Sequence, residues 1–368
     1  MKLTWSVVPL PLREPFRISR SVMSTRDAVQ LVLHHDGVSG YGEIVTSAYY
    51  GLDVPGIVAA LTGLPACPDP ETLLAELPDL PYPPGVLAGL DAAAFDLMGK
   101  RDGLPVHRLA GHPEWRPVPT AYTIGICDPS RAGETARDLG ERGFTVLKVK
   151  LGSPDEDDDV ARVAAVRAAV PGARLLLDPN GAWTAEQAVR ILERMPYADA
   201  VEQPVPPGRP DLLAWVSERS PTPVIADEDA VDAADVERLA GAVAGVNVKV
   251  AKCGGVRAAL RVIDAARGHG MNVMLGCLVA SSLGVAPAAH LAGHARWTDL
   301  DGHLLLARDP WTGIGGEDGV LRLSGRPGLG VRRAEETGGE ENETGGEEGA
   351  PWHPGPPGPG VRRADEAG

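Results

Sequence analysis

Six residues of two chemical types follow one another along the chain in an order that suits proton chemistry. Lys148 and Lys150 come first, the carboxylates Asp178, Glu202 and Asp227 follow, and Lys249 comes last. Each lies at or near the end of a short apolar run, where parallel strands of a barrel present their functional side chains. The chain has six lysines among 35 basic residues, and four of them lie in two of these segments. Lysine, unlike arginine, can lose its proton inside a protein, so these segments suit a neutral amine.

The three carboxylates predict a metal site. Carboxylates that converge on one point repel each other unless a cation joins them. Oxygen ligands with no histidine or cysteine among them suit Mg²⁺, or Mn²⁺, rather than Zn²⁺. The predicted ligands are therefore Asp178, Glu202 and Asp227.

The lysines predict proton transfer at a carbon atom. Lys148 and Lys150 are two residues apart and point to the same face of their strand. Lys249 belongs to the sixth run, across a barrel from the second. One amine would remove a proton and the other would return it to the opposite face, while the metal stabilises the resulting enediolate. A nearby dication and a second lysine would also lower the amine pKa, as a general base requires.

Taken one at a time, these residues also have ordinary explanations. A Lys-x-Lys pair can lie on a solvated strand face, Asp178 can cap the following turn, and Glu202 can be a plain strand end. Lys252 either lies near the site or packs against the Gly-Gly turn that follows it. Cys277 lacks an evident base, so we expect it to line the pocket rather than act as a nucleophile.

The elements that must position these residues form a repeating pattern from Pro117 onward. Eight short apolar runs recur about every 20 to 30 residues, with amphipathic helical stretches between them. Short connections between parallel strands favour right-handed crossovers, and eight strands favour a closed barrel. A doubly wound open sheet is the structural alternative.

The flanking segments differ from this pattern. Residues 1–116 are predicted as an α+β capping domain, with strands near 3–12 and 28–44, and a helix ending at Gly103. Residues 13–27 and 46–53 are predicted as loops that could cover a site. The barrel is predicted over 117–318, and 319–333 would return to complete the capping domain. Residues 334–368 are acidic, of low complexity and too poor in apolar residues to fold.

Composition narrows the functional class. The net charge of −15 argues against nucleic acid or anionic lipid as a partner, because both require a basic surface. No apolar run is long enough to span a bilayer, and the N-terminal segment lacks the apolar core of a signal peptide. The four cysteines are scattered without a CxxC pair, so we expect a reduced, cytoplasmic protein.

The segments that carry the six residues resemble a known family. They read KVK at 148–150, LLLDPNGAW, VEQPV, IADED and NVKVAKCGG, in that order. Together they resemble the muconate-lactonizing subgroup of the enolase superfamily over about residues 1–331. The resemblance implies an α/β fold, with a (β/α)₇β TIM-like barrel beneath an N-terminal α+β capping domain. It also implies one Mg²⁺ per subunit and an acid/base pair of Lys150 and Lys249.

Asp299 and Asp301 narrow the resemblance to the dipeptide epimerase family. Members of that family place Asp-x-Asp at the end of the eighth strand, where it binds the α-ammonium group of the substrate. Two carboxylates near a pocket mouth do favour a cationic terminus over an acyl group. Alternatively, Asp299 and Asp301 pair with Arg296 or Arg308.

The resemblance implies three further substrate contacts. Lys148 would bind the substrate carboxylate, and Thr123 matches a substrate-contacting threonine of the family. Arg20 aligns with a loop arginine that pairs with a side-chain carboxylate in the Ala-Glu-specific members, although an arginine at the protein surface explains it almost as well.

The predicted function is therefore Mg²⁺-dependent epimerisation of a dipeptide, by 1,1-proton transfer at the α-carbon of its C-terminal residue through an enediolate. The alternative within the superfamily is an o-succinylbenzoate synthase or an N-acylamino acid racemase. A barrel that binds a metal or a peptide without catalysis is a third hypothesis. The predicted partner is a small dipeptide, with no nucleic acid or membrane, and a homo-oligomer is compatible with the family.

Overall fold

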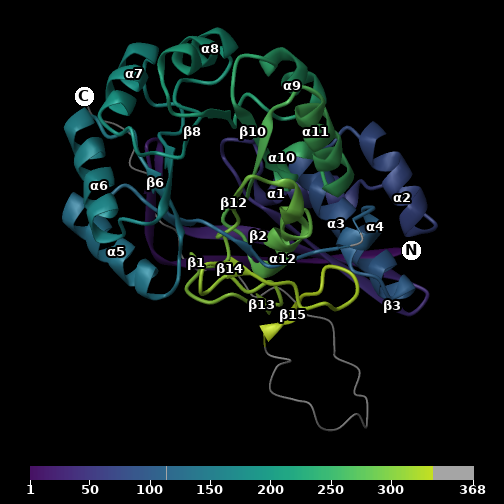
Figure 1. The fold of residues 1–368 in the computed structure, drawn as a ribbon. Helices are drawn as coiled ribbons and strands as arrows, with labels where there is room; N and C mark the ends of the chain where they lie inside the picture. Colours follow the sequence, from purple (N-terminus) through teal and green to yellow (C-terminus); the bar gives the residue numbers. More distant parts are fainter. Residues whose placement is uncertain (113, 335–368) are drawn as a thin grey trace, which may run out of the picture.

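The computed structural model describes residues 1–112 and 114–334. Figure 1 shows a ring of helices around a central group of strands, with a second unit of strands and helices beside it. The predicted acidic tail lies outside the described residues from position 335 onward. No described helix is both long and apolar enough to cross a membrane.

The N-terminal unit is an antiparallel sheet covered by helices. Its strands pair in the order β1-β2-β3 and comprise β1 (Lys2–Ile18), β2 (Ser21–His35) and β3 (Val38–Val45). The HDG turn joins β2 to β3, and both Asp36 and Gly37 adopt the left-handed backbone that such a tight turn needs. The helices are α1 (Val54–Thr62), α2 (Pro70–Glu76), the 3₁₀ turn η1 (Leu77–Asp79), α3 (Pro84–Asp102) and α4 (Val106–Leu109).

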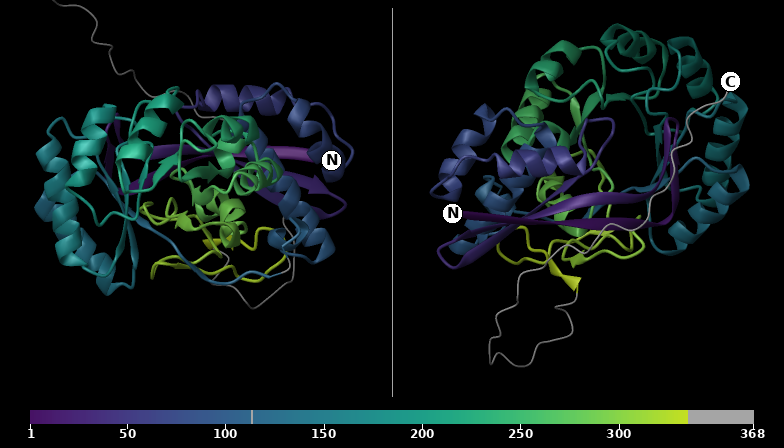
Figure 2. Two further views of the ribbon diagram at one scale, coloured as in Figure 1. Left: turned by 45° about the horizontal axis from the view of Figure 1, so that its top comes forward. Right: turned by 180° about the vertical axis from the view of Figure 1, so that it is seen from behind.

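The prediction of a loop over residues 13–27 is wrong. Strands β1 and β2 continue through this segment as a long ribbon, with Phe16 opposite Met23 and Ile18 opposite Ser21. Most of the ribbon's side chains beyond Pro11 are exposed, so the sequence there lacks the apolar alternation that marks a half-buried strand. Figure 2 shows β1 and β2 reaching from the N-terminal unit across to the side of the barrel that carries α5 and α6.

The second unit is a barrel of eight parallel strands, as the sequence predicts. The strands are hydrogen-bonded in sequence order and comprise β5 (Tyr122–Ile124), β6 (Val146–Lys150), β7 (Arg174–Asp178), β8 (Ala200–Glu202), β9 (Val224–Ala226), β10 (Gly245–Lys249), β11 (Asn272–Gly276) and β12 (Trp297–Asp299). The backbone N–H of Ala121 donates to Thr298 at 2.9 Å, which joins the segment before β5 to β12. The sheet is therefore nearly closed.

Seven helical crossovers link these strands, so the barrel has the predicted (β/α)₇β order. The helices are α5 (Pro129–Glu141), α6 (Glu156–Ala169), α7 (Ala185–Glu193), α8 (Pro210–Arg219), α9 (Ala233–Leu239), the short α10 (Val250–Cys253) with α11 (Val256–Gly268), and α12 (Ser282–Ala289), followed by the 3₁₀ turn η2 (Ala292–His294). Several have strong caps, as at α7, where Thr184 and Gln187 form a reciprocal capping box.

The barrel interior has an apolar layer beneath a polar one. Ala121, Val146, Leu176, Ala200, Ile225, Met274 and Trp297 pack together as a separate cluster. Two residues further along four of these strands come Lys148, Asp178, Glu202 and Asp299. Because side chains two apart share a strand face, the polar residues must point into the barrel above the apolar layer.

Buried carboxylates dock the N-terminal unit onto the barrel. Glu43 on β3 accepts hydrogen bonds from the backbone N–H of Ser281 at 2.8 Å, from Ser281 Oγ at 2.6 Å and from Gln30 Nε2 at 3.0 Å. Ser281 is the N-cap of α12, so the contact reaches a barrel helix. Asp91 on α3 likewise accepts from the N–H of Val256, the first residue of α11, at 2.6 Å.

The chain returns to the N-terminal unit after the barrel. Strand β14 (Val320–Leu321) pairs with β4 (Val118–Pro119), and β13 (Trp311–Thr312) pairs with β15 (Arg332–Arg333). The N–H of Leu329 donates to Asp96 on α3 at 2.8 Å. The division at 1–116, 117–318 and 319–333 stays a prediction.

Candidate active site

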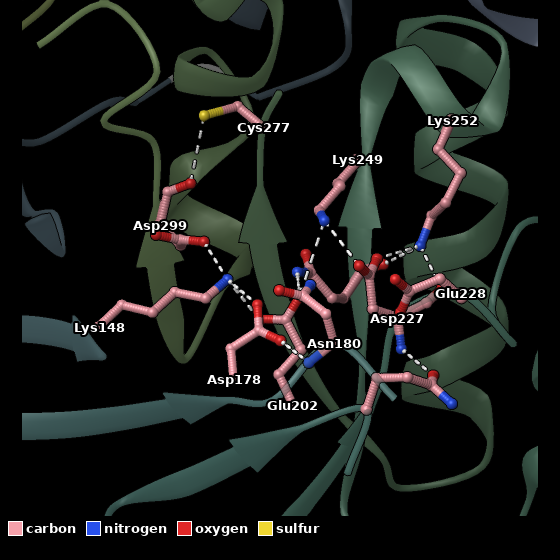
Figure 3. A network of polar contacts seen from close by, with 12 residues as sticks. Lys148, Asp178, Asn180, Glu202, Asp227, Glu228, Lys249, Lys252, Cys277 and Asp299 are labelled. Carbon is pink, nitrogen blue, oxygen red and sulfur yellow. Dashed lines mark hydrogen bonds and ion pairs between the residues drawn. The ribbon is translucent and has the colours of Figure 1, made fainter. Parts of the chain in front are cut away.

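Lys148 lies at the centre of the polar layer. Its Nζ is 2.6 Å from Glu202, 2.7 Å from Asp299 and 3.0 Å from Asp178, and its side chain is 2% exposed. Figure 3 shows it reaching between these carboxylates from the opposite side to Lys252. Three carboxylates from three different strands are therefore drawn together around one ammonium group.

Lys150 and Lys249 lie at two ends of the same row of charges. Lys150 Nζ is 2.5 Å from Asp178, while Lys249 Nζ is 2.6 Å from Asp227 and 3.7 Å from Glu202. Strands β6 and β10 are four places apart in the order of eight, so these two lysines reach the carboxylates from opposite walls of the barrel.

Lys252 contacts the site rather than the Gly-Gly turn alone. Its Nζ donates to the carbonyl and the carboxylate of Asp227, at 2.6 and 2.8 Å, and to the carbonyl of Asn247 at 2.8 Å. The side chain is 1% exposed. Lys252 therefore fixes the direction of the Asp227 carboxylate from below.

Two neutral side chains complete the polar layer, and the sequence analysis did not identify them. Asn247 donates to Glu202 at 2.8 Å, and Gln203 accepts the backbone N–H of Asp227 at 3.0 Å. Asn247 lies two residues before Lys249 on the same strand, so the strand period alone predicts that it points inward. Gln203 lies in the EQP segment with a left-handed backbone, φ 37°, which no periodicity signals.

Burial and neighbouring charges shift the pKa of several groups in this layer. Burial and the charge of Asp178 raise the pKa of Glu202 to about 7. Burial alone would raise the pKa of Asp178 and Asp227, but the facing lysines outweigh it and lower both. For Lys249, burial is likewise outweighed by Asp227 and Glu202, so its pKa lies well above the usual value. The sequence analysis predicts a lowered lysine pKa beside a dication. Where only carboxylates face the amine, the pKa of Lys249 is raised instead.

The donor set suits a hard divalent cation. Asp178, Glu202 and Asp227 are buried carboxylates on successive strand ends, and consecutive members share a lysine. Within residues 1–112 and 114–334, no three acidic, histidine or cysteine side chains are already arranged to hold a metal. The lysine ammonium groups contact these carboxylates instead. The carboxylates of Asp178 and Glu202 repel each other, and a cation between them would relieve this repulsion. Because all the donors are oxygens, the set fits Mg²⁺.

Asp299 and Asp301 meet Thr123 at the far wall of the barrel. Asp301 accepts the N–H of Thr123 at 2.6 Å, and Asp299 accepts from its hydroxyl at 3.3 Å. Burial, followed by the charge of Asp299, raises the pKa of Asp301 to about 7. Cys277 donates its thiol to the carbonyl of Asp299 at 3.4 Å, and burial raises the pKa of that thiol, so it is held as a neutral group.

Arg20 occupies the turn of the β1–β2 ribbon and reaches down to the barrel. Its guanidinium is 2.9 Å from Glu228 and donates to the carbonyl of Asn180 at 3.2 Å. It also lies over the ring of Tyr49, 4.5 Å from the centroid. The structure thus places Arg20 at the site, with its charge already paired.

Many of these groups border one cavity of about 470 Å³ between the barrel mouth and the N-terminal unit. The barrel contributes Thr123, Lys148, Lys150, Lys249, Asp299 and Asp301, and the ribbon contributes residues from Phe16 to Arg26. Asp178 and Glu202 are more deeply buried, beneath the lysines. The volume lies within the range of small-molecule sites.

Comparisons with known proteins agree with this geometry. Residues 2–111 match the family profile described as mandelate racemase / muconate lactonizing enzyme, N-terminal domain, and residues 131–337 match the profile described as enolase C-terminal domain-like.

Two curated relatives cover nearly the whole chain. An L-Ala-D/L-Glu epimerase of Bacteroides thetaiotaomicron is 32% identical over 90% of this chain and 88% of its own length. A hydrophobic dipeptide epimerase of Roseobacter litoralis is 34% identical over 90% and 98%. Among solved structures, a dipeptide epimerase of Enterococcus faecalis, complexed with Mg and L-Leu-L-Tyr, superimposes with a TM-score of 0.84 at 29% identity, over 89% of this chain and 98% of that one.

Proposed function

Because the chain belongs to the dipeptide epimerase family of the enolase superfamily, we propose that it inverts the α-carbon of the C-terminal residue of a dipeptide. One observation carries the proposal. Lys150 and Lys249 approach a single row of carboxylates from opposite walls of a cavity that also contains Asp299 and Asp301.

Lys150 and Lys249 are the proposed acid/base pair. A carbon held between them has one amine on each face, so one lysine removes its proton and the other returns a proton to the opposite face. A lysine accepts a proton only as the free amine. Lys249 faces Asp227 and Glu202, so the charge of these carboxylates must be neutralised before it can act as the base.

Asp178, Glu202 and Asp227 are the proposed ligands of one Mg²⁺ per subunit, with Mn²⁺ as an alternative. When bound, the cation supplies positive charge beside the substrate carboxylate, which makes the neighbouring α-proton more acidic. Lys252 and Gln203 hold Asp227 in place, and Asn247 holds Glu202. The Mg²⁺ complex of the Enterococcus faecalis relative supports this choice of metal.

Asp299 and Asp301 are proposed to bind the α-ammonium group of the substrate, beside Thr123. Two carboxylates at this wall favour a cationic terminus over an acylated one, which argues against the N-acylamino acid racemase and o-succinylbenzoate synthase alternatives. Lys148 is proposed to contact the substrate carboxylate, Cys277 to form part of the wall, and Arg20 to cover the opposite end of the cavity.

The remaining partner predictions also stay proposals. A net charge of −15 supports a small-molecule substrate rather than nucleic acid or an anionic membrane. We also propose a cytoplasmic location and a homo-oligomeric state, which fit the family.

The test is α-proton exchange in ²H₂O with Mg²⁺ and a panel of L,L-dipeptides, followed by mass spectrometry and NMR. Wild-type protein is expected to introduce deuterium at the α-carbon of the C-terminal residue and to produce the L,D diastereomer. Lys150→Met and Lys249→Met should each abolish epimerisation, and any residual exchange should be confined to one diastereomer, a different one for each variant. Absence of exchange from the whole panel, or equal exchange by both variants from both diastereomers, would contradict the proposal.

A further inference from the structure

Arg26 is a second arginine of the ribbon that faces the cavity. It lies on β2 opposite Leu10 of β1, which is 1% exposed. Ala28 and Gln30 follow at two-residue spacing on the same strand face, and Gln30 contacts Glu43, which docks onto the barrel. Since alternate residues of a strand share a face, the side chain of Arg26 points toward the barrel mouth. It also borders the cavity.

The charge of Arg26 has no acidic partner among the described residues. Its Nη1 donates to the backbone carbonyl of Thr46, and its Nε is buried with no hydrogen-bond partner. Burial lowers the pKa of Arg26 to about 10, and no neighbouring charge contributes to the shift. Arg20, in contrast, is already paired with Glu228. Of the two ribbon arginines that border the cavity, Arg26 is thus the one with guanidinium donors free for an anion.

Arg26 lies at the Asp301 end of the cavity. The ribbon strand opposite it contacts the segment that follows Asp301, because Leu12 bridges Leu306 and the N–H of Arg13 donates to Leu305 at 3.0 Å. Leu305 lines the same cavity.

Arg20 lies at the other end of the cavity, over Asn180. The five residue-to-residue steps of extended chain from Ser21 to Arg26 span about 16 Å. Arg20 and Arg26 therefore lie near different ends of a molecule bound in the cavity.

We propose that Arg26 binds a carboxylate on the side chain of the N-terminal residue of the substrate, so that the preferred dipeptides begin with Glu or Asp. This inference rests on the proposed function, because it places the ammonium group of that residue at Asp299 and Asp301. An acidic side chain on the same residue then extends toward the ribbon, where the guanidinium can donate hydrogen bonds from its free nitrogens.

The experiment compares binding and turnover of L-Glu-L-Ala, L-Asp-L-Ala, L-Gln-L-Ala and L-Ala-L-Ala in the presence of Mg²⁺. Calorimetry measures the affinity, and α-proton exchange measures kcat and KM. Wild-type protein is expected to bind L-Glu-L-Ala or L-Asp-L-Ala about tenfold or more tightly than L-Gln-L-Ala, since a charged hydrogen-bonded pair replaces a neutral one. The preference should appear in KM rather than in kcat.

Two substitutions separate charge from hydrogen bonding. Arg26→Gln keeps a donor for the Thr46 carbonyl but removes the charge, and should reduce the acidic preference to about twofold or less. Arg26→Lys should keep part of the preference. Arg13→Gln removes a charge from an exposed position of the same ribbon and should leave the preference unchanged. Thermal unfolding of each variant reports whether the fold is retained.

The outcomes distinguish this inference from the proposed function. Equal affinity for L-Glu-L-Ala, L-Asp-L-Ala and L-Gln-L-Ala, weaker binding of the acidic dipeptides, or no binding of any of them overturns the role of Arg26, even where L-Ala-L-Ala is epimerised. An acidic preference that survives Arg26→Gln overturns it as well. Tight, Arg26-dependent binding of an acidic dipeptide without any proton exchange supports the proposed role of Arg26 and contradicts the proposed epimerase activity.

Discussion

Replacing Asp301 with asparagine should make the protein more stable and its substrate binding weaker. The change keeps the size of the side chain and an oxygen to accept the Thr123 N–H, so packing and that hydrogen bond are retained. What it removes is a buried carboxylate next to the carboxylate of Asp299. The expected gain in the free energy of unfolding therefore measures how strongly the buried charge of Asp301 destabilises the folded protein.

The magnitude follows from the pKa. Asp301 titrates at about 7 in the folded protein against 3.8 for an ordinary aspartate, a difference of about 3 units or about 4 kcal/mol. Because the folded state binds the proton more tightly than the unfolded state, wild-type stability falls as the pH rises from about 4 to about 7. Asparagine does not titrate. Relative to wild type, the variant should gain about 2 kcal/mol more between pH 5.5 and pH 8.5, and about 4 kcal/mol in total at the higher pH.

Urea unfolding of both proteins at a series of pH values measures this difference. Asp138→Asn is the matched control, because it removes an aspartate charge from an exposed position of α5 and should show little change with pH. A stability difference between Asp301→Asn and wild type that stays constant from pH 5.5 to 8.5, or that favours wild type at high pH, would refute the reasoning. The same variant should bind dipeptides less tightly above pH 7, because it lacks one of the two charges proposed to face the ammonium group.

Three further predictions concern pH, domain docking and the metal. In wild type, kcat/KM should fall up to tenfold per pH unit below about 7, because protonation of Asp301 removes its charge from the proposed ammonium site, and initial rates between pH 5.5 and 8.5 test this. A flat profile through that range would contradict it. Glu43→Ala should lower the free energy of unfolding by about 2 to 4 kcal/mol, because it leaves the donors of Ser281 and Gln30 unpaired. The free energy of unfolding of Glu43→Gln should stay within about 1 kcal/mol of wild type. Burial raises the pKa of Glu43, and the unpaired Oε1 of Gln30 can accept a hydrogen bond from the new amide once the Gln30 amide has flipped. Denaturant titration of both variants measures these changes. Chelation by EDTA should abolish α-proton exchange, and added Mg²⁺ should restore it, whereas exchange that persists after exhaustive chelation would exclude the predicted metal dependence.

The barrel could be predicted because its strands repeat a strong local signal. Each apolar run ends in a polar residue, and the topology then brings Asp178, Glu202 and Asp299 within 3.0 Å of Lys148 without further information. The strand period also accounts for Lys148 and Lys150 sharing a face. The fold class and the family are confirmed by the structure and by the relatives, whereas the roles of individual site residues stay predictions.

What the sequence did not reveal depends on contacts between distant segments. The ribbon over residues 13–27 is polar because it is exposed, so its pattern does not differ from that of a loop. Arg26 gives no local sign of facing a cavity, since this depends on the pairing of β1 with β2 and on where the ribbon crosses the barrel. The pairing of Arg20 with Glu228 joins residues 208 positions apart. The contact of Lys252 with Asp227 follows from the short helix α10, which turns the lysine back beneath the strand ends.

The pairing of β1 with β2 over the barrel mouth has a consequence for how such an enzyme can change over evolutionary time. The proposed proton-transfer groups all belong to the barrel, whereas Arg20 and Arg26 belong to a two-stranded arm whose own backbone pairing holds its shape. Mutations on that arm can therefore retune which side chains are admitted without disturbing the atoms that handle the proton. With the proposed roles, side-chain selection can diversify on the arm while the barrel preserves the chemistry.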